Sequence, residues 1–97
     1  MAFHFSAGIT TAATQLTNSA VTLFYGATVK AAAANTGKVY LGYANTVTAL
    51  TSAANDGFEL SAGEAYYIPK NETGTNGLTN VYLIASTGTQ TVTVIGS

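Results

Sequence analysis

The chain has 97 residues, of which 7% are charged, with a formal net charge of −1 and neither cysteine nor arginine. This length fits one domain, and the absence of cysteine excludes disulfides and thiolate metal sites. Three lysines are too few to neutralise the phosphates of a nucleic acid, so we expect no nucleic-acid partner. The charged fraction lies far below the roughly 25% of typical soluble domains, which favours a protein whose surface is partly covered by neighbours in an assembly.

The amino-terminal end and the apolar stretches carry no targeting signal. Residues 1–6 lack the basic and apolar regions of a signal peptide, and no apolar stretch approaches the roughly 20 residues of a membrane span. We therefore expect a protein made in the cytoplasm, with no membrane partner.

The first half of the chain divides into an arm and the start of a domain. Residues 1–19 are predicted to form an amino-terminal arm or a first weak strand, and residues 20–97 a β-sandwich domain. A β-forming run over 20–34 is interrupted by Gly26, where we expect a bulge or a bend. This run should end at the turn Asn35-Thr36-Gly37.

The middle of the chain predicts further short strands. Residues 38–43 read as a compact strand with Val39, Leu41 and Tyr43 on one face, and residues 45–50 offer another short strand. Residues 57–69 predict two strands around Ser61-Ala62-Gly63. In the first of these, Phe58 and Leu60 should face inward and Glu59 outward. The second should end at Pro69, which lacks a backbone N–H.

The end of the chain predicts a loop and a β-hairpin. Residues 70–80 are polar and predict a loop. Residues 71–80 and the first six residues are the segments we expect to be mobile or ordered by a partner. Residues 80–97 hold two apolar, β-branched runs around Gly88, a pattern typical of a hairpin. Strand alternation turns one set of side chains toward the core: Val81, Leu83, Ala85, Val92 and Val94. The other set faces outward and should present part of a contact surface: Tyr82, Ile84, Thr91, Thr93 and Ile95.

These signals predict an all-β protein. Seven or eight short strands with no convincing helix favour a single antiparallel β-sandwich that is jelly-roll-like.

Groups able to carry chemistry are few. His4 is the only histidine, and nothing in the sequence places a serine and a buried carboxylate beside it to form a catalytic triad. Asp56, Glu59 and Glu64, near Asn55, offer oxygens for calcium but lack a regular D-x-D-x-D spacing. Two of these carboxylates could form a glycosidase pair, but the chain is too short to build a substrate groove around a sandwich. We therefore expect no enzymatic activity and no cofactor.

The tyrosines favour contact more than catalysis. All six fall in predicted strands, where a ring can stack on a sugar, contact another protein, or pack in the core with its hydroxyl at the rim. Tyr66 and Tyr67 are adjacent in one strand, so at least one should face outward. The candidate interface combines this pair with the arm and the terminal strands: Phe3, His4, Phe5, Tyr66, Tyr67, Tyr82 and Ile84.

Three blocks of the sequence carry a resemblance to a known group of proteins. They are AAAANTGKVYLGY (31–43), GFELSAGEAYYIP (57–69) and LTNVYLIASTGTQTVTVIG (78–96). In this order, over residues 20–97, the chain resembles small β-sandwich virion proteins of tailed bacteriophages, encoded among head and tail genes. The resemblance implies a structural protein without enzymatic activity, and no functional residues carry over because the shared pattern consists of turns and core strands.

The resemblance sets the functional expectation. Small domains of this class often serve as capsid decoration (cement) proteins, so we expect a virion protein on the capsid surface, assembled in the cytoplasm of the bacterial host. Its partners would be the major capsid protein and copies of itself, with a trimer the most plausible homo-oligomer. The uncharged amino-terminal segment could pair with a strand edge of a neighbouring subunit. The alternative is a glycan-binding, fibre or tail appendage domain that attaches to the host surface through outward tyrosines.

Overall fold

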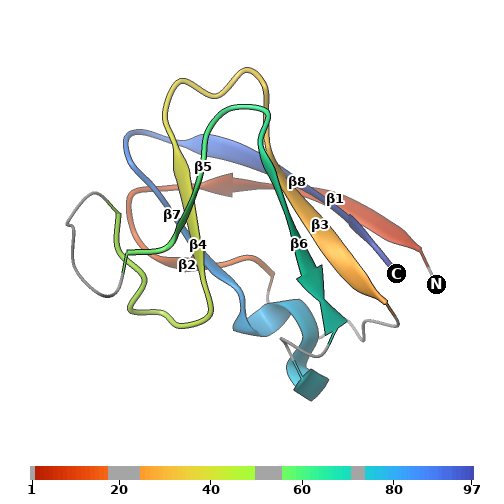
Figure 1. The fold of residues 1–97 in the computed structure, drawn as a ribbon. Helices are drawn as coiled ribbons and strands as arrows, with labels where there is room; N and C mark the ends of the chain where they lie inside the picture. The colour runs from red at the N-terminus through yellow and green to blue at the C-terminus, as the bar shows by residue number, and fades with distance from the viewer. Residues whose placement is uncertain (1, 18–24, 50–55, 71–73) are drawn as a thin grey trace.

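The computed structural model describes residues 2–17, 25–49, 56–70 and 74–97, and it confirms the all-β prediction. Within these residues, eight strands form two antiparallel sheets of four strands each (Figure 1). The strands and a 3-10 segment, η1, which is kinked at Gly77, have the following bounds: β1 (Phe3–Ile9), β2 (Thr14–Gln15), β3 (Gly26–Ala31), β4 (Val39–Gly42), β5 (Phe58–Leu60), β6 (Ala65–Pro69), η1 (Gly74–Asn80), β7 (Tyr82–Ala85) and β8 (Gln90–Gly96).

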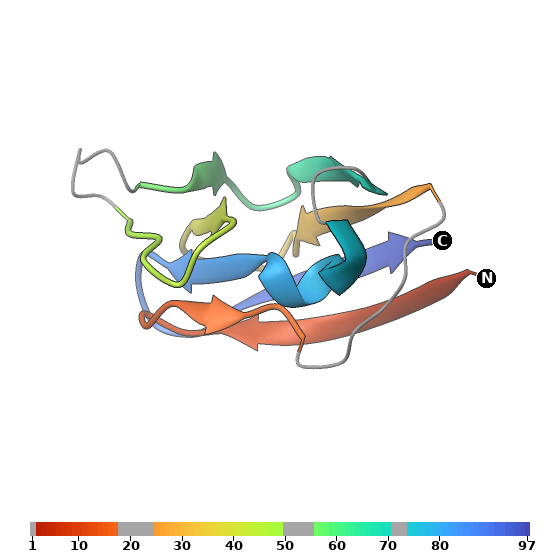
Figure 2. The ribbon, with the colours of Figure 1, turned by 90° about the horizontal axis from the view of Figure 1, so that it is seen from below.

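The strand order is that of a jelly roll. The first sheet has the order β1-β8-β3-β6 and the second the order β2-β7-β4-β5. Successive pairs are nested, because β1 pairs with β8, β2 with β7, β3 with β6, and β4 with β5. Two packed sheets built in this way are a jelly-roll sandwich, which confirms that part of the prediction. Figure 2 shows β1 and β2 along one side of the sandwich, with β5 and β6 along the opposite side.

The predicted terminal hairpin is wrong. β7 lies in the second sheet and β8 in the first, so the connection between them crosses from one sheet to the other. The predicted facing of the two strands is confirmed, because their burial alternates as expected. Alternation in the sequence indicates which side of a strand faces the core. The pattern is the same whether the next strand pairs with the first in one sheet or lies in the opposite sheet.

Side chains from the inner faces of both sheets form one core. The buried cluster draws on six strands, on Leu16 after β2, and on Leu78 and Val81 around η1. Its members are Ile9, Leu16, Ala27, Val29, Val39, Leu41, Ile68, Leu78, Val81, Leu83, Ala85, Val92 and Val94. The segment around η1, predicted as a loop, thus supplies core side chains, while residues 71–73 lie outside the described part.

Several predicted strand boundaries differ from those observed. The first strand begins at Phe3, within the residues expected to be mobile, and pairs with β8 along its length. Between 45 and 49 the structure has only an isolated bridge from Thr48 to Asp56, and residue 50 lies outside the described residues. The predicted strand over 20–34 is described only from residue 25 onward, with β3 ending at Ala31.

Two aromatic residues are more exposed than expected. Tyr43 follows β4 and is exposed, so its prediction on the core face is wrong. Phe58 does pair with Leu41 on the core side of the sheet, but β5 is an edge strand and the side chain is 55% exposed. A position at a sheet edge lacks neighbours on one side, which alternation alone does not reveal.

The Asn35-Thr36-Gly37 turn is bonded to the start of β8. Asn35 donates its side-chain N–H to the Thr91 carbonyl and accepts the Thr91 N–H, both at 2.9 Å. The buried Gln90 accepts the N–H groups of Thr36 and Gly37 and donates to the carbonyl of Thr87. Each polar atom of the Gln90 side chain is therefore bonded, and the place where the chain changes sheet is fixed.

Candidate contact surface

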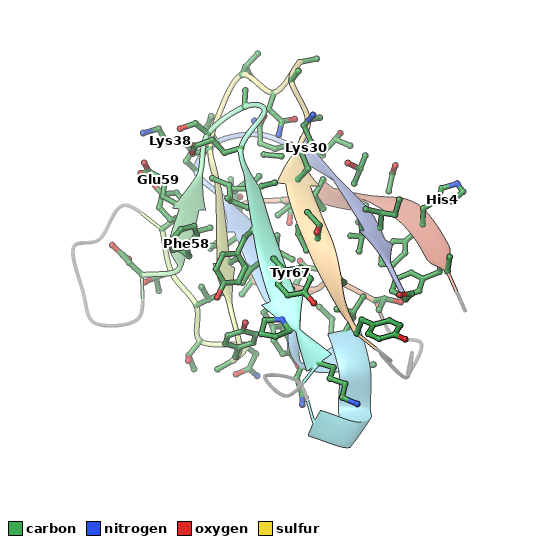
Figure 3. All side chains as sticks on the ribbon, turned by 45° about the vertical axis from the view of Figure 1, so that its right-hand side comes forward. His4, Lys30, Lys38, Phe58, Glu59 and Tyr67 are labelled. Atoms are coloured by element: carbon green, nitrogen blue, oxygen red, sulfur yellow. The ribbon has the colours of Figure 1, made fainter. Side chains whose placement is uncertain are left out.

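The outer face of the first sheet is an open strand surface built from alternate residues. Pairing aligns His4, Ile95, Thr28 and Tyr67 in one row across the four strands. A second row, one step along each strand, consists of Ser6, Thr93, Lys30 and Ala65. These eight residues, with Thr91, are called the outer face of the first sheet. His4 and Tyr67 lie on its opposite edge strands and Lys30 toward one end (Figure 3).

Small hydroxyl side chains surround an apolar centre on this face. Ile95 is 64% exposed in the central strand β8, where a β-branched residue of that size is ordinarily covered. An open hollow of about 400 Å³ lies over the same strands. Lys30 is the one formally charged residue of this face. A partner can therefore cover the face while removing little charge from water. The hollow is lined by His4, Phe5, Ser6, Thr28, Lys30, Ala65, Thr93, Val94 and Ile95.

Tyr67 is held in position at one side of this face. Its hydroxyl donates a hydrogen bond of 2.9 Å to the backbone carbonyl of Tyr25. Its ring lies against Gly26, where an added Cβ would come within 2.5 Å of the Tyr67 hydroxyl. Gly26 therefore permits the ring to cover the start of β3. An exposed ring fixed in this way loses little conformational entropy when a partner contacts it.

The outer face of the second sheet is closed by its own side chains. Tyr40 points to this side between Glu59 and Ile84 but is only 4% exposed. Its hydroxyl donates to Glu59 at 2.9 Å, and the Lys38 ammonium forms an ion pair with the same carboxylate at 3.1 Å. Val47, in the connection after β4, packs against Gly42 on the same strand. Figure 3 shows Lys38 and Glu59 together on this sheet.

The same contacts change two pKa values. The Lys38 ammonium and the Tyr40 hydroxyl stabilise the charged form of Glu59 and lower the pKa of its carboxyl. Burial, together with the bond to Glu59, raises the pKa of Tyr40. Both pKa shifts follow from a structural cluster in which Lys38, Tyr40 and Glu59 bond to one another.

The predicted interface residues separate into three groups. His4 and Tyr67 belong to the outer face of the first sheet. Tyr82 and Ile84 are half-buried on the outer side of the second sheet. The remaining three turn toward the core and are half-buried: Phe3, Phe5 and Tyr66.

Two aromatic contacts account for the inward group. The rings of Phe3 and Phe5 stack with centroids 6.3 Å apart. Tyr66 packs against Phe58 from the other sheet, with centroids 5.0 Å apart, at the side of the sandwich formed by β5 and β6. The prediction that one residue of the Tyr66-Tyr67 pair faces outward is confirmed, and that residue is Tyr67.

The seven residues of the candidate interface leave out two exposed side chains. Ile95 was expected on the outward contact side of the last strand but was not among the seven, and Tyr25 was weighed with the other tyrosines but was not chosen. The signal for Ile95 is present in the sequence, because an isoleucine stands out between Thr93 and the chain end on the polar side of β8. What the sequence does not show is that β8 lies in the centre of an open sheet.

The acidic residues considered for calcium binding lie apart in separate contacts. Asp56 accepts the Thr48 hydroxyl at 2.7 Å, Glu59 bonds to Lys38 and Tyr40, and Glu64 accepts the Ser61 N–H at 2.7 Å within its own turn. In the part of the chain that the structure describes, no three His, Asp or Glu side chains gather to hold a metal ion. Asn55 lies outside the described residues.

Comparisons with protein-family models, with curated proteins and with solved structures find no match to this chain. The helical segments in the described residues include none that is long and apolar enough to cross a membrane.

Proposed function

We propose that this chain is a non-enzymatic structural protein of a tailed bacteriophage, a capsid decoration protein that binds the major capsid protein on the outside of the head and stabilises it. The observation that carries the proposal is the outer face of the first sheet, which is open, nearly uncharged and apolar at its centre around Ile95. The resemblance of the three sequence blocks to small virion proteins indicates the class of partner, which is the major capsid protein.

The composition and rigidity of the outer face of the first sheet suit binding to a protein that is present in many copies on a shell. Interfaces are depleted in charge at their centre and enriched in aromatic side chains, and this face combines Ile95 and Tyr67 with small hydroxyl residues. Strand side chains on a packed sandwich are rigid, so little conformational entropy is lost on binding. A modest contact becomes strong in effect when many copies bind one repeating shell.

The test is binding to undecorated capsids. Purified protein should co-sediment with capsids that lack it and should raise their resistance to heat. Ile95→Glu, which places a charge at the centre of the face, should weaken binding at least tenfold, about 1.4 kcal/mol or more. Gln15→Glu introduces the same charge on β2 of the second sheet; it gives up the exposed hydrogen bond from the Gln15 amide to the Thr79 carbonyl, and it should bind like the wild type. Absence of wild-type binding would refute the proposal.

A second candidate function is glycan binding by a fibre or tail appendage, and the fixed ring of Tyr67 is the observation that favours it. An exposed tyrosine ring beside hydroxyl groups is a surface on which a sugar can stack. A glycan array would decide between the two. Reproducible sugar binding that Tyr67→Ala abolishes and Tyr67→Phe retains would favour the appendage.

A further inference from the structure

The two sheets present four edge strands, and three of them are protected against pairing with another chain. β2 has two residues and β5 three, and β6 ends at Pro69 followed by Lys70. Short length, proline and charge are the usual means by which proteins protect sheet edges. Among the described residues, β2, β5 and β6 have a strand on one side only. Their protection therefore prevents another chain from pairing with the open side.

The fourth edge strand, β1, has none of these protections. It is seven residues long, and its sequence FHFSAGI contains no proline and no formally charged residue. Its register with β8 runs from Phe3 opposite Gly96 to Ile9 opposite Gln90 without a bulge. In the described part of the chain the first sheet ends at this strand. A long, regular and uncharged edge of this kind is a template for pairing.

The backbone groups on the free side of β1 can be assigned from the hydrogen-bond alternation of antiparallel strands. Gly26 and Ser97 exchange both backbone hydrogen bonds, so the odd-numbered residues of β8 bond to β3 and the even-numbered residues to β1. The register then places the odd-numbered residues of β1 in bonds to β8. The N–H and C=O groups of His4, Ser6 and Gly8 therefore point away from the sheet.

We infer that β1 pairs antiparallel with β1 of a second copy of this chain, with Ser6 on the two-fold axis. This register places Ser6 opposite the second copy's Ser6, and His4 opposite the second copy's Gly8. Every free N–H and C=O of the three residues is then bonded, because each such pair exchanges two hydrogen bonds. An edge whose free groups match their own copy under a two-fold axis is self-complementary.

The side chains of β1 support the same register. Phe3 and Phe5 face the inner side of the sheet but remain half-buried, with the two-residue strand β2 on the same side of the sandwich (Figure 2). In the proposed pairing Phe5 lies beside the second copy's Ala7, and Phe3 beside the second copy's Ile9. Apolar residues of both copies thus meet on the inner side, and no like charges are opposed. A small domain without disulfides gains stability from such an association.

The pairing closes after two copies and so gives a dimer, whereas the sequence led us to expect a trimer. It does not depend on capsid binding, and it is tested on the free protein. Sedimentation over a range of concentrations should show a dimer for the wild type. Ser6→Pro removes an N–H from the free edge without touching the bonds to β8, and it should sediment as a monomer. Should that variant not fold, Ser6→Lys places two like charges at the axis and should weaken self-association at least tenfold.

Cross-linking tests the register, since the chain has no cysteine of its own. Residues directly opposite in such a pair have Cα atoms about 5.5 Å apart, within the range of a disulfide. With oxidised glutathione as the oxidant, Ser6→Cys should give a covalent dimer. Thr93→Cys, which lies beside Ser6 on β8, should remain uncross-linked. A wild-type monomer or trimer, or equal cross-linking of the two variants, would overturn the inference.

Discussion

The two outer faces of the sandwich differ in how their side chains are used. On the second sheet Tyr40 is 4% exposed, bonded to Glu59 and flanked by Lys38. On the first sheet Ile95 is 64% exposed among threonines. The same alternation of residues produces both faces, yet only the first is left open. A jelly roll can therefore use one outer face for its own stability and keep the other for a partner.

The largest expected effect concerns the closed face. Tyr40→Ala removes a buried ring and leaves Glu59 without one of its donors, so the free energy of unfolding should fall by about 3 kcal/mol. Ile95→Ala on the open face should change it by less than about 0.5 kcal/mol. Denaturant unfolding of the two variants measures both values. Equal losses would mean that the two faces do not differ.

The next effect concerns the cover over β4. Val47 is 6% exposed and packs on Gly42, so Val47→Ala should lower the free energy of unfolding by about 2 kcal/mol. Thr93→Ala, on the open face, is the matched control and should leave stability nearly unchanged. A neutral Val47→Ala would show that the connection after β4 does not seal this face.

A smaller effect is expected when only the Tyr40 hydroxyl is removed. Tyr40→Phe should lower stability by about 1 kcal/mol, because one hydrogen bond to a carboxylate is lost. The raised pKa of Tyr40 means that the folded state holds the phenol proton more tightly than the unfolded state. Wild-type stability should therefore fall as pH rises above about 10, the ordinary tyrosine value, toward the higher folded value. The Phe variant should lack that decline in alkaline unfolding curves.

The smallest effect is at acid pH. The lowered pKa of Glu59 means that the unfolded state binds its proton more readily, so the stability it contributes is present above the ordinary glutamate value and is lost as pH falls through the lower folded value. Thermal unfolding between neutral and acid pH should show this loss. Its size is modest because Lys38 and Glu59 are both about half exposed. In Glu59→Gln this part of the pH dependence should disappear, and an unchanged curve would contradict the assignment.

Much of the fold follows from local patterns in the sequence. The alternation in Val81–Ala85 and Thr91–Ile95 identified the core side of both strands, and Pro69 ends β6 as expected. The sheet to which each strand belongs was not predictable in this way. The pairing of β8 with β1 and β3 joins residues far apart in the chain, and the short connection after β7 does not distinguish a hairpin from a crossing between sheets.

The contact surface was less predictable for the same reason. Phe3, Phe5 and Tyr66 are aromatic and lie near the chain end or in a strand, but whether they face the core depends on the sheet above them. Ile95 matters because β1 and β3 flank β8 on its two sides, and that neighbourhood is set by the topology. Residue type identified candidates, and tertiary pairing decided which of them meet on one surface.

We propose that the outer face of the first sheet, and not that of the second, contacts the capsid. Thr93→Cys and Gln15→Cys place single thiols on the two sheets of a chain without cysteine. Thiol-labelling rates should be measured for each variant, free and bound to capsids. Binding to capsids should slow labelling at position 93 at least tenfold and leave labelling at position 15 unchanged. Protection of position 15 with position 93 still reactive would contradict it.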